Sequence, residues 1–129
     1  MGHRIIPEEE LAEILRKHGL WLRGEPGGVR DDLRGADLRW ADLSGANLRD
    51  ADLSGANLDY TCWPLWCGSL GVKVDKRIAA QIAYHFCQLG CEDPDYIRAR
   101  NAILDFANTF HRVKECGELK PLPEPPKEY

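Results

Sequence analysis

The sequence predicts a short β-solenoid that is closed by helices, and two observations carry this prediction. Between residues 31 and 60 the chain of 129 residues repeats with a period of five, and amphipathic segments with helical spacing flank the repeats. A period of five matches neither the 3.6 residues of an α-helix nor the two of a β-strand. On a helix five residues advance by about 500°, and on a strand successive leucines would face opposite sides. The leucines share one interior only if the chain turns a corner in every repeat, so that four corners close one coil.

The residue types within each repeat fit this geometry. Residues 31–60 read DDLRG, ADLRW, ADLSG, ANLRD, ADLSG and ANLDY. Leucine would fill the axis, alanine two positions earlier would leave room at a corner, and Asp or Asn between them can hydrogen-bond to backbone at tight turns. The predicted core consists of the six leucines and the next residue in phase: Leu33, Leu38, Leu43, Leu48, Leu53, Leu58 and Trp63.

These A(D/N)LxX repeats resemble the pentapeptide-repeat family, and the resemblance covers residues 29–63. It implies a right-handed quadrilateral β-helix in which the central leucine and the preceding alanine point inward and the other positions face solvent. Six clear repeats, extended in phase to Gly28 and Trp63, predict about one and a half to two coils whose strands lie about 4.8 Å apart. Residues twenty apart then stack, which places Trp40 over Tyr60 as an exposed aromatic ladder.

Helical signals precede the repeats. Residues 7–18 begin with proline, carry three glutamates in the first turn and end with basic residues, which together favour a helix that stops at Gly19. Residues 20–22 then predict a short strand, and residues 25–28 predict a turn. Because a short solenoid exposes both ends of its core, we expect this N-terminal block to cap one end; a protruding recognition helix is the alternative.

Two further helices are predicted after the repeats, over residues 75–89 and 94–116, and their short connection indicates an antiparallel hairpin. Their expected inward faces are Ile78, Ile82, Phe86 and Leu89 in the first, and Tyr96, Ala99, Ile103, Phe106, Phe110 and Val113 in the second. The predicted domains are a helical cap (1–28), the solenoid (29–66), the C-terminal helical hairpin (67–120) and a proline-rich tail (121–129) that we expect to be extended and mobile.

Bulk properties narrow the classes of function. The net charge is −4, which gives no direct reason to expect nucleic-acid binding. No apolar run reaches the length of a membrane span, and charges follow the N-terminus at once, so that neither a membrane protein nor a secreted protein is expected. Five cysteines without a signal sequence indicate free thiols in a reducing compartment, and the expected location is the cytoplasm.

The sequence favours neither a metal site nor a catalytic site. The C-terminal half holds thiols and imidazoles that could bind zinc, but the spacing CxxC…CxxC is absent and free cysteine is commonly buried. No nucleophile elbow or phosphate-binding loop is present, and the periodic aspartates are explained as turn formers, so that an enzyme and a cofactor are not expected. A zinc or redox module remains the alternative, and it would use Cys62, Cys67, His85, Cys87, Cys91, His111 and Cys116.

The resemblance also raises DNA mimicry, because some members of the family bind DNA gyrase by imitating the duplex. Residues 30–60 contain seven aspartates and four arginines, a net charge of −3. Two coils rise by about 10 Å, a length over which duplex DNA presents roughly six phosphate charges. The solenoid alone is therefore too short and too diluted by arginine for a convincing rod-like mimic, and a solvated surface of mixed charge is favoured.

The sequence therefore predicts a small, non-enzymatic protein of bacterial or phage type that binds another macromolecule. The expected partner is a protein, without direct contact to nucleic acid or membrane. A narrower hypothesis is inhibition of a nucleic-acid enzyme, such as a topoisomerase or a CRISPR-type defence nuclease, by blocking or mimicking its DNA-binding site. The alternatives are a structural homodimer and a flank or tail that covers the aromatic face. The predicted interaction residues are Trp40, Tyr60, Arg39, Asp59, Asp37, Asp42 and Asp52.

Overall fold

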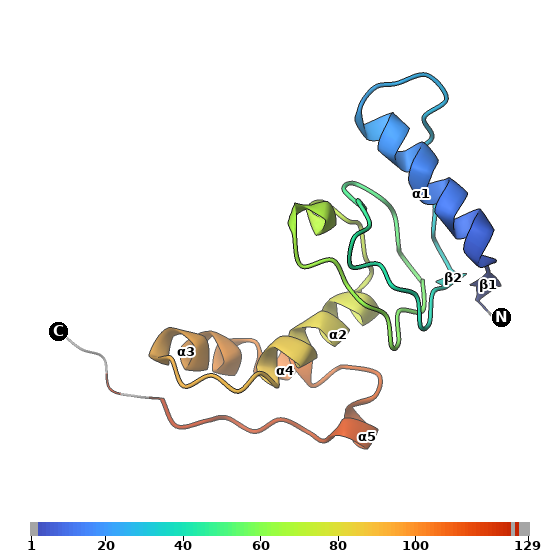
Figure 1. Ribbon diagram of the computed structural model, residues 1–129. Helices are drawn as coiled ribbons and strands as arrows, with labels where there is room; N and C mark the ends of the chain where they lie inside the picture. Colours follow the sequence, from blue (N-terminus) through green and yellow to red (C-terminus); the bar gives the residue numbers. More distant parts are fainter. Residues whose placement is uncertain (1–2, 125, 127–129) are drawn as a thin grey trace. The chain divides into compact units, whose positions relative to one another are not determined.

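The computed structural model describes residues 3–124 and 126, and the chain divides into two compact units, Met1–Asp75 and Lys76–Tyr129. Each unit is described by itself. The first contains β1 (Arg4–Ile5), α1 (Glu8–Leu22), β2 (Ala36–Asp37) and a 3-10 turn, η1 (Cys67–Ser69); the second contains α2 (Lys76–Cys87), α3 (Pro94–Ala102), α4 (Leu104–Ala107) and α5 (Val113–Cys116) (Figure 1).

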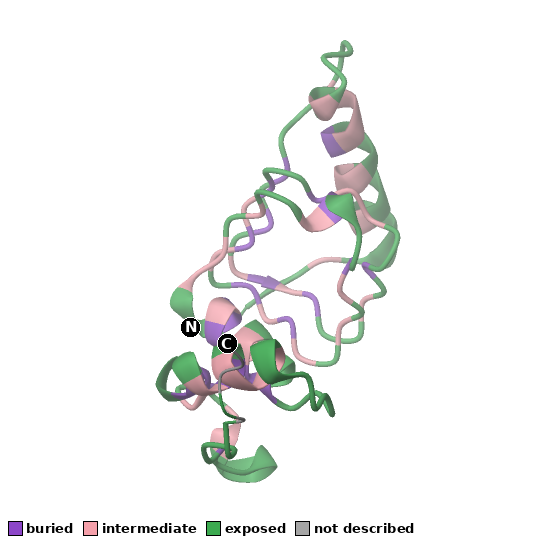
Figure 2. Cartoon of the chain, turned by 90° about the vertical axis from the view of Figure 1, so that its left-hand side faces the viewer, coloured by how far each residue is buried: buried purple, intermediate pink, exposed green. Residues whose placement is uncertain are grey.

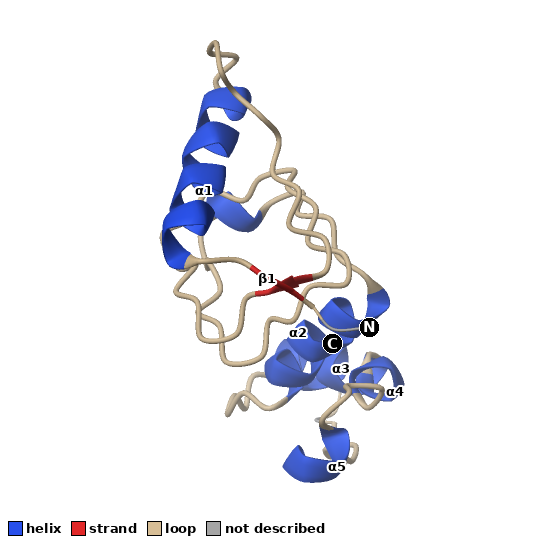
Figure 3. Ribbon diagram, turned by 90° about the vertical axis from the view of Figure 1, so that its right-hand side faces the viewer, coloured by secondary structure: helices blue, strands red, loops and turns tan. Residues whose placement is uncertain are grey.

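The repeats form a coil whose successive turns pair in parallel at a spacing of twenty residues, four repeats to a turn. The paired positions include Asp32 with Asp52 and Asp37 with Asn57. The amides of five of the six leucines donate to carbonyls on the next turn, with N···O distances from 2.7 to 3.0 Å between Leu33 and Asp52, Leu38 and Asn57, Leu43 and Cys62, Leu48 and Gly68, and Leu53 and Lys73. Because these bridges are isolated, Figure 3 draws the coil almost entirely as loop, with β1 and β2 as its red segments.

Each corner of the coil is a β-turn closed by the same backbone hydrogen bond. The Ala36 amide donates to the Leu33 carbonyl at 3.1 Å, and the same bond recurs at Ala41, Ala46, Ala51, Ala56 and Thr61. The Asp or Asn before each leucine accepts from the amide two residues on, as Asp42 Oδ1 does from Ser44 N at 3.0 Å. The third turn residue has a positive φ at Gly35, Trp40, Asp50, Gly55 and Tyr60, which defines a type II turn at these five corners, whereas Gly45 at the remaining corner has no positive φ.

The leucines line the interior of this coil. All six, from Leu33 to Leu58, are at most 6% exposed, and Figure 2 shows the buried segments recurring along the turns. Full burial of a leucine side chain contributes roughly 1.5–3 kcal/mol relative to exposure. Trp63, which was predicted to belong to the core, is only partly buried, because the regular pairing at twenty residues gives way to η1 after Cys62.

Helix α1 is longer than the sequence predicted. The expected stop at Gly19 and the expected strand over residues 20–22 are wrong, because the helix continues to Leu22. A glycine inside a helix costs about 1 kcal/mol, which tertiary contacts of the last turn outweigh. The Trp21 indole stacks on the His18 ring at 5.5 Å, and Gly28 packs so closely on the Trp21 backbone that a Cβ would lie 2.5 Å from its Cα.

His18 joins α1 to the coil. The ring is fully buried, Nδ1 accepts a hydrogen bond from the Asp31 amide at 2.9 Å, and Nε2 lies 2.7 Å from the Arg49 carbonyl oxygen. These partners require the neutral tautomer with its proton on Nε2, since a protonated Nδ1 would point a second donor at the Asp31 amide. Burial lowers the pKa of His18 in the same direction. The imidazole thus acts as both donor and acceptor between α1 and two turns of the coil.

The N-terminal strand β1 also pairs with the coil. Arg4 and Ile5 of β1 pair in parallel with Ala36 and Asp37 of β2. The Arg4 amide donates to the Gly35 carbonyl at 2.7 Å, and its guanidinium donates to the Asp32 carbonyl at 2.7 Å. Residues 4–5 therefore continue the ladder of the coil on one side.

The C-terminal helices differ from the prediction. The single helix expected over residues 94–116 is wrong; α3, α4 and α5 replace it, because the chain leaves helical geometry at Ile103 and again after Ala107. The expected inward face of α2 is also wrong at Ile82, Phe86 and Leu89, which are exposed. Of the inward residues expected in the second helix, Ala99, Ile103 and Phe106 are exposed, while Phe110 is buried.

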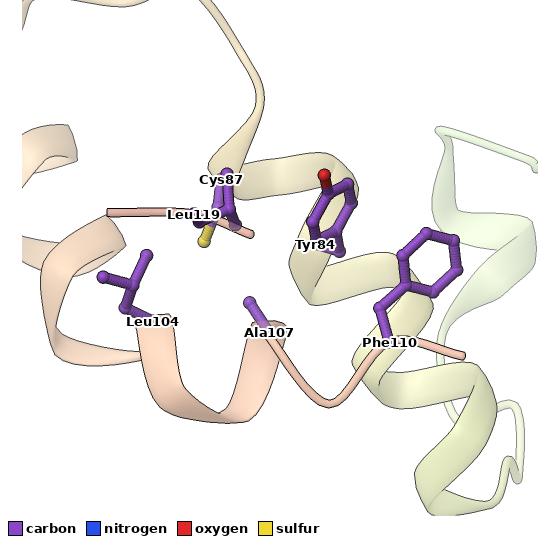
Figure 4. Close-up of a cluster of buried hydrophobic side chains, with 6 residues drawn as sticks. All are labelled: Tyr84, Cys87, Leu104, Ala107, Phe110 and Leu119. Atoms are coloured by element: carbon purple, nitrogen blue, oxygen red, sulfur yellow. The ribbon is translucent and has the colours of Figure 1, made fainter. Parts of the chain in front are cut away.

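The core of the second unit forms on the other apolar side of α2. Helix α2 packs against α4, and the buried cluster consists of Tyr84, Cys87, Leu104, Ala107, Phe110 and Leu119 (Figure 4). The Tyr84 hydroxyl donates to the Gly117 carbonyl at 2.6 Å, a bond that favours this side of the helix over the stripe of Ile82 and Phe86. Apolar spacing alone could not distinguish the two faces.

The start of the predicted mobile tail is held by hydrogen bonds, which corrects that expectation for residues 121–122. The Asn101 side chain bonds the carbonyl and the amide of Leu122 at 2.8 and 3.0 Å, and Asn108 does the same for Leu119 at 3.0 and 2.8 Å. Residues 125 and 127–129 of the predicted tail lie outside the described residues.

The carboxyl group of Asp31 is buried without compensation. The residue is 3% exposed, and neither side-chain oxygen meets a hydrogen-bonding partner among residues 3–124 and 126. Burial raises the pKa of Asp31 from 3.8 to about 7. The folded protein therefore holds this proton more tightly than the unfolded chain, and the associated stability is present below pH 4 and lost as the pH rises through 7.

We predict that Asp31→Ala removes this pH dependence and stabilises the protein at pH 8. Alanine occupies the matching position of the next five repeats, and the pKa difference corresponds to roughly 4 kcal/mol at full ionisation. Urea unfolding at pH 5 and pH 8, followed by the fluorescence of the tryptophans, measures the effect. Asp42→Asn, at an exposed position, serves as the control and should change little; an Asp31→Ala variant that is less stable than the wild type at pH 8 would contradict the assignment.

Candidate interaction surface

The coil stacks Trp40 on Tyr60 at its surface. The two residues lie twenty apart in sequence, at the same corner of successive turns, and their rings are parallel to within 5° at a centroid distance of 4.3 Å. Trp40 is 74% exposed and Tyr60 53% exposed. Two large aromatic side chains thus form one flat exposed stack, which we call the aromatic face.

Both residues stand where the backbone favours glycine. Their φ angles are 69° and 64°, and the equivalent positions of other repeats are Gly35 and Gly55, with φ of 69° and 75°. A left-handed conformation costs a residue with a Cβ roughly 1–2 kcal/mol. Residues held in such conformations tend to gather at functional sites. The aromatic face is therefore maintained against a local cost in stability.

An ion pair borders the aromatic face. The Arg39 guanidinium donates to both carboxylate oxygens of Asp37 at 3.0 and 2.8 Å, and this hydrogen bonding lowers the pKa of Asp37 to about 2. The charge of Asp59 also acts on Arg39. The structure therefore brings together five of the predicted interaction residues: Trp40, Tyr60, Arg39, Asp37 and Asp59.

The comparison with protein families agrees with this architecture. A family model described as "Pentapeptide repeats (8 copies)" matches residues 32–62. Residues 32–62 of the chain are pentapeptide repeats. Neither the curated proteins nor the solved structures gave a match. Pentapeptide repeats build a β-solenoid, and their proteins generally serve structure and protein interaction rather than catalysis.

The remaining aspartates of the pentapeptide repeats do not join the aromatic face. Asp42 pairs across turns with Cys62 and Asp52 with Asp32, whereas Asp37 pairs with Asn57, so that these carboxylates lie on different sides of the coil. Asp52 is 3.8 Å from the Lys73 ammonium group, and Asp32 forms an ion pair with Arg34 at 2.8 Å. The acidic charge of the repeats is therefore spread around the coil and partly neutralised, unlike a row of phosphates.

The predicted zinc ligands are not assembled. Across residues 3–124 and 126, no group of three or more His, Cys, Asp or Glu side chains is placed to hold a metal ion. Cys62, Cys67, Cys91 and Cys116 are exposed, while Cys87 is buried, which raises the pKa of its thiol. The imidazoles of His85 and His111 both lie against the Phe110 ring, at 5.8 and 4.9 Å.

The helices were compared with the requirements of a membrane span. In the part of the chain that it describes, no helix combines the length and the apolar character needed to cross a bilayer.

The sequence interpretation missed the polar junction of His18 and Asp31, although one signal was present. Asp31 occupies the inward alanine position of the first repeat, the position held by Ala36 and Ala41 in the next two. A charged residue at an inward position is costly when it is buried without a partner. The break in the pattern at Asp31 therefore marked the contact between the coil and α1.

We predict that Trp40→Gly is more stable than Trp40→Ala by about 1 kcal/mol, because glycine relieves the left-handed backbone and alanine does not. Both variants lose the ring stack, so that the difference between their free energies of unfolding reports the strain of the backbone at residue 40. Thermal and urea unfolding of the two variants measure it, and at Leu65, whose φ is not positive, the same pair should show no such preference for glycine. An alanine variant as stable as the glycine variant would contradict the strain at this corner.

Proposed function

We propose that this pentapeptide-repeat protein binds another protein through its aromatic face and performs no catalysis. The observation that supports the proposal is the exposed stack of Trp40 and Tyr60 in glycine-type positions. Tryptophan and tyrosine are the residues most enriched among the energetic centres of protein interfaces. A mixed-charge border, here Asp37 and Arg39, is typical of the rim of such interfaces.

Rigidity of the coil supports the same conclusion. Backbone bonds define each corner, and the Asp37 side chain accepts from the Arg39 amide at 3.2 Å, immediately before Trp40. The amide of Leu38 is bonded to the carbonyl of Asn57 on the next turn. Side chains carried by an ordered backbone lose less conformational entropy on association. The coil thus acts as a preorganised support for the aromatic face.

In this proposal α1 closes one end of a right-handed, four-sided coil. The support comes from the contacts of His18 with Asp31 and Arg49, and from the Val29 amide, which donates to the Lys17 carbonyl at 3.1 Å. A short solenoid without such a cover would expose its leucine core.

We extend the proposal to inhibition of a nucleic-acid enzyme, such as a topoisomerase or a CRISPR-type nuclease. Contact of the aromatic face with a basic DNA-binding surface would block access of DNA without imitating the duplex. The net charge of −4 favours approach to such a surface. The scattered position of the aspartates favours this blocking mode over mimicry of a phosphate row.

Affinity capture from a bacterial lysate, with mass-spectrometric identification, tests the binding proposal. We expect a partner that is retained by the wild type and lost by the double variant Trp40→Gly, Tyr60→Gly, which removes both rings without straining the turns. Leu65→Ala, at an exposed apolar position elsewhere in the same unit, is the matched control and should retain the partner. Equal retention by all three proteins would contradict the proposal.

The structural homodimer is distinguished by light scattering after size exclusion. We expect a monomer mass for the wild type and for the double variant. A dimer that dissociates in the double variant would show that the aromatic face pairs with itself instead of with another protein.

A further inference from the structure

One face of the Trp40 indole is open. Tyr60 covers the other face in a parallel stack at 4.3 Å, and the indole is nevertheless 74% exposed. The open face of an aromatic ring carries the negative side of its quadrupole, and tryptophan binds cations more strongly than tyrosine or phenylalanine does. The stack thus presents a flat, electron-rich surface to a partner.

The charges nearest to this surface in the chain are weakly acidic in sum. Asp37, Arg39 and Asp59 lie beside the stacked residues; Arg39 and Asp37 offset each other in a bidentate pair, so that Asp59 leaves a net charge of −1. A second acidic group comes from α1, whose first turn consists of Glu8, Glu9 and Glu10, all exposed.

The pairing of β1 and β2 brings the two acidic groups to one side of the coil. Ile5 pairs with Asp37 in parallel, so that the two chains continue in the same direction from this pair. Glu8 follows Ile5 by three residues, and Trp40 follows Asp37 by three residues. Three residues span at most roughly 10 Å, so that Glu8 and Trp40 each lie within about that distance of the paired residues.

We infer that the open face of Trp40 receives a guanidinium or ammonium group from the partner protein, an arginine or lysine side chain held between the indole and the neighbouring carboxylates. This inference rests on the proposed function and adds the chemistry of the contact. An arginine is favoured, because its planar guanidinium stacks on the indole and donates sideways to carboxylate oxygens at the same time. Nucleic acid is disfavoured as the occupant, because its phosphates would meet the negative charge of Asp59 and of the first turn of α1.

Peptide probes test the contact on the full chain without knowledge of the partner. We would titrate the ¹⁵N-labelled protein with an acetylated and amidated tri-arginine peptide, and separately with the tri-citrulline peptide, which has nearly the same shape and no charge. The readout is the indole N–H signal of Trp40, distinguished from those of Trp21, Trp63 and Trp66 by its loss in Trp40→Phe.

Tri-arginine should shift the Trp40 signal saturably, with an affinity higher than that of tri-citrulline by at least roughly two- to fivefold, the range of one exposed cation–π contact. In the Trp40 variants, which lack this indole, binding is followed by the backbone amide signals of Arg39 and Tyr60. Trp40→Phe should weaken binding of tri-arginine, Trp40→Gly should abolish it, and Trp66→Phe, at another exposed indole, should leave it unchanged. The double variant Glu8→Gln, Glu9→Gln should weaken it at low salt. Equal binding of the two peptides, an unmoved Trp40 signal, or preferential binding of a thymidine octanucleotide would overturn the inference.

The two proposals fail separately. A lysate partner that depends on the aromatic face, together with a Trp40 signal that ignores tri-arginine, would retain the binding function and refute the cationic contact. Saturable binding of tri-arginine at Trp40, together with a lysate in which no partner depends on the aromatic face, would support the contact and refute the binding function.

Discussion

The structure of the first unit depends on one arrangement, in which a leucine, from Leu33 to Leu53, points into the coil while its own amide donates to a carbonyl on the next turn. Leu38, for example, is buried and donates to the carbonyl of Asn57, nineteen residues later. A residue can do both only if the chain turns a corner every five residues, because helical or continuous strand geometry would send successive leucines in different directions. The type II turns and the Asp or Asn bonds to backbone are the local means by which that corner is made.

The same arrangement explains why the surface of the coil can carry function. Since leucine and alanine fill the interior, the third turn residue projects outward and is free to vary within the limits of its positive φ. Glycine adopts the positive φ without strain at Gly35 and Gly55. At Trp40 and Tyr60 the same φ strains the backbone, and the two side chains form an exposed aromatic stack. The burial of the Asp31 carboxyl beside the His18 junction is a second local cost, and it ties the stability of the first unit to pH.

The sequence predicted the first unit better than the second for a physical reason. A five-residue period admits one backbone solution, so that the spacing of four repeats to a turn and the stack of Trp40 on Tyr60 follow from counting. Helix α2 has apolar residues on two sides, and the partner for each side depends on tertiary contacts such as the bond from Tyr84 to Gly117, which spacing does not reveal. The division of the C-terminal segment into α3, α4 and α5 likewise depends on side chains such as Asn108, which bonds Leu119.

Hydrogen exchange of individual amides, measured by NMR, tests the coil most directly. The amides of Leu33, Leu38, Leu43, Leu48 and Leu53 all donate to carbonyls on the next turn, and they should therefore exchange slowly and with similar protection. The amides of Arg34, Arg39 and Ser44 bond only to neighbouring Asp side chains at exposed corners, and they should exchange faster. Leucine amides that exchange as fast as these corner amides would contradict a coil held by bonds between its turns.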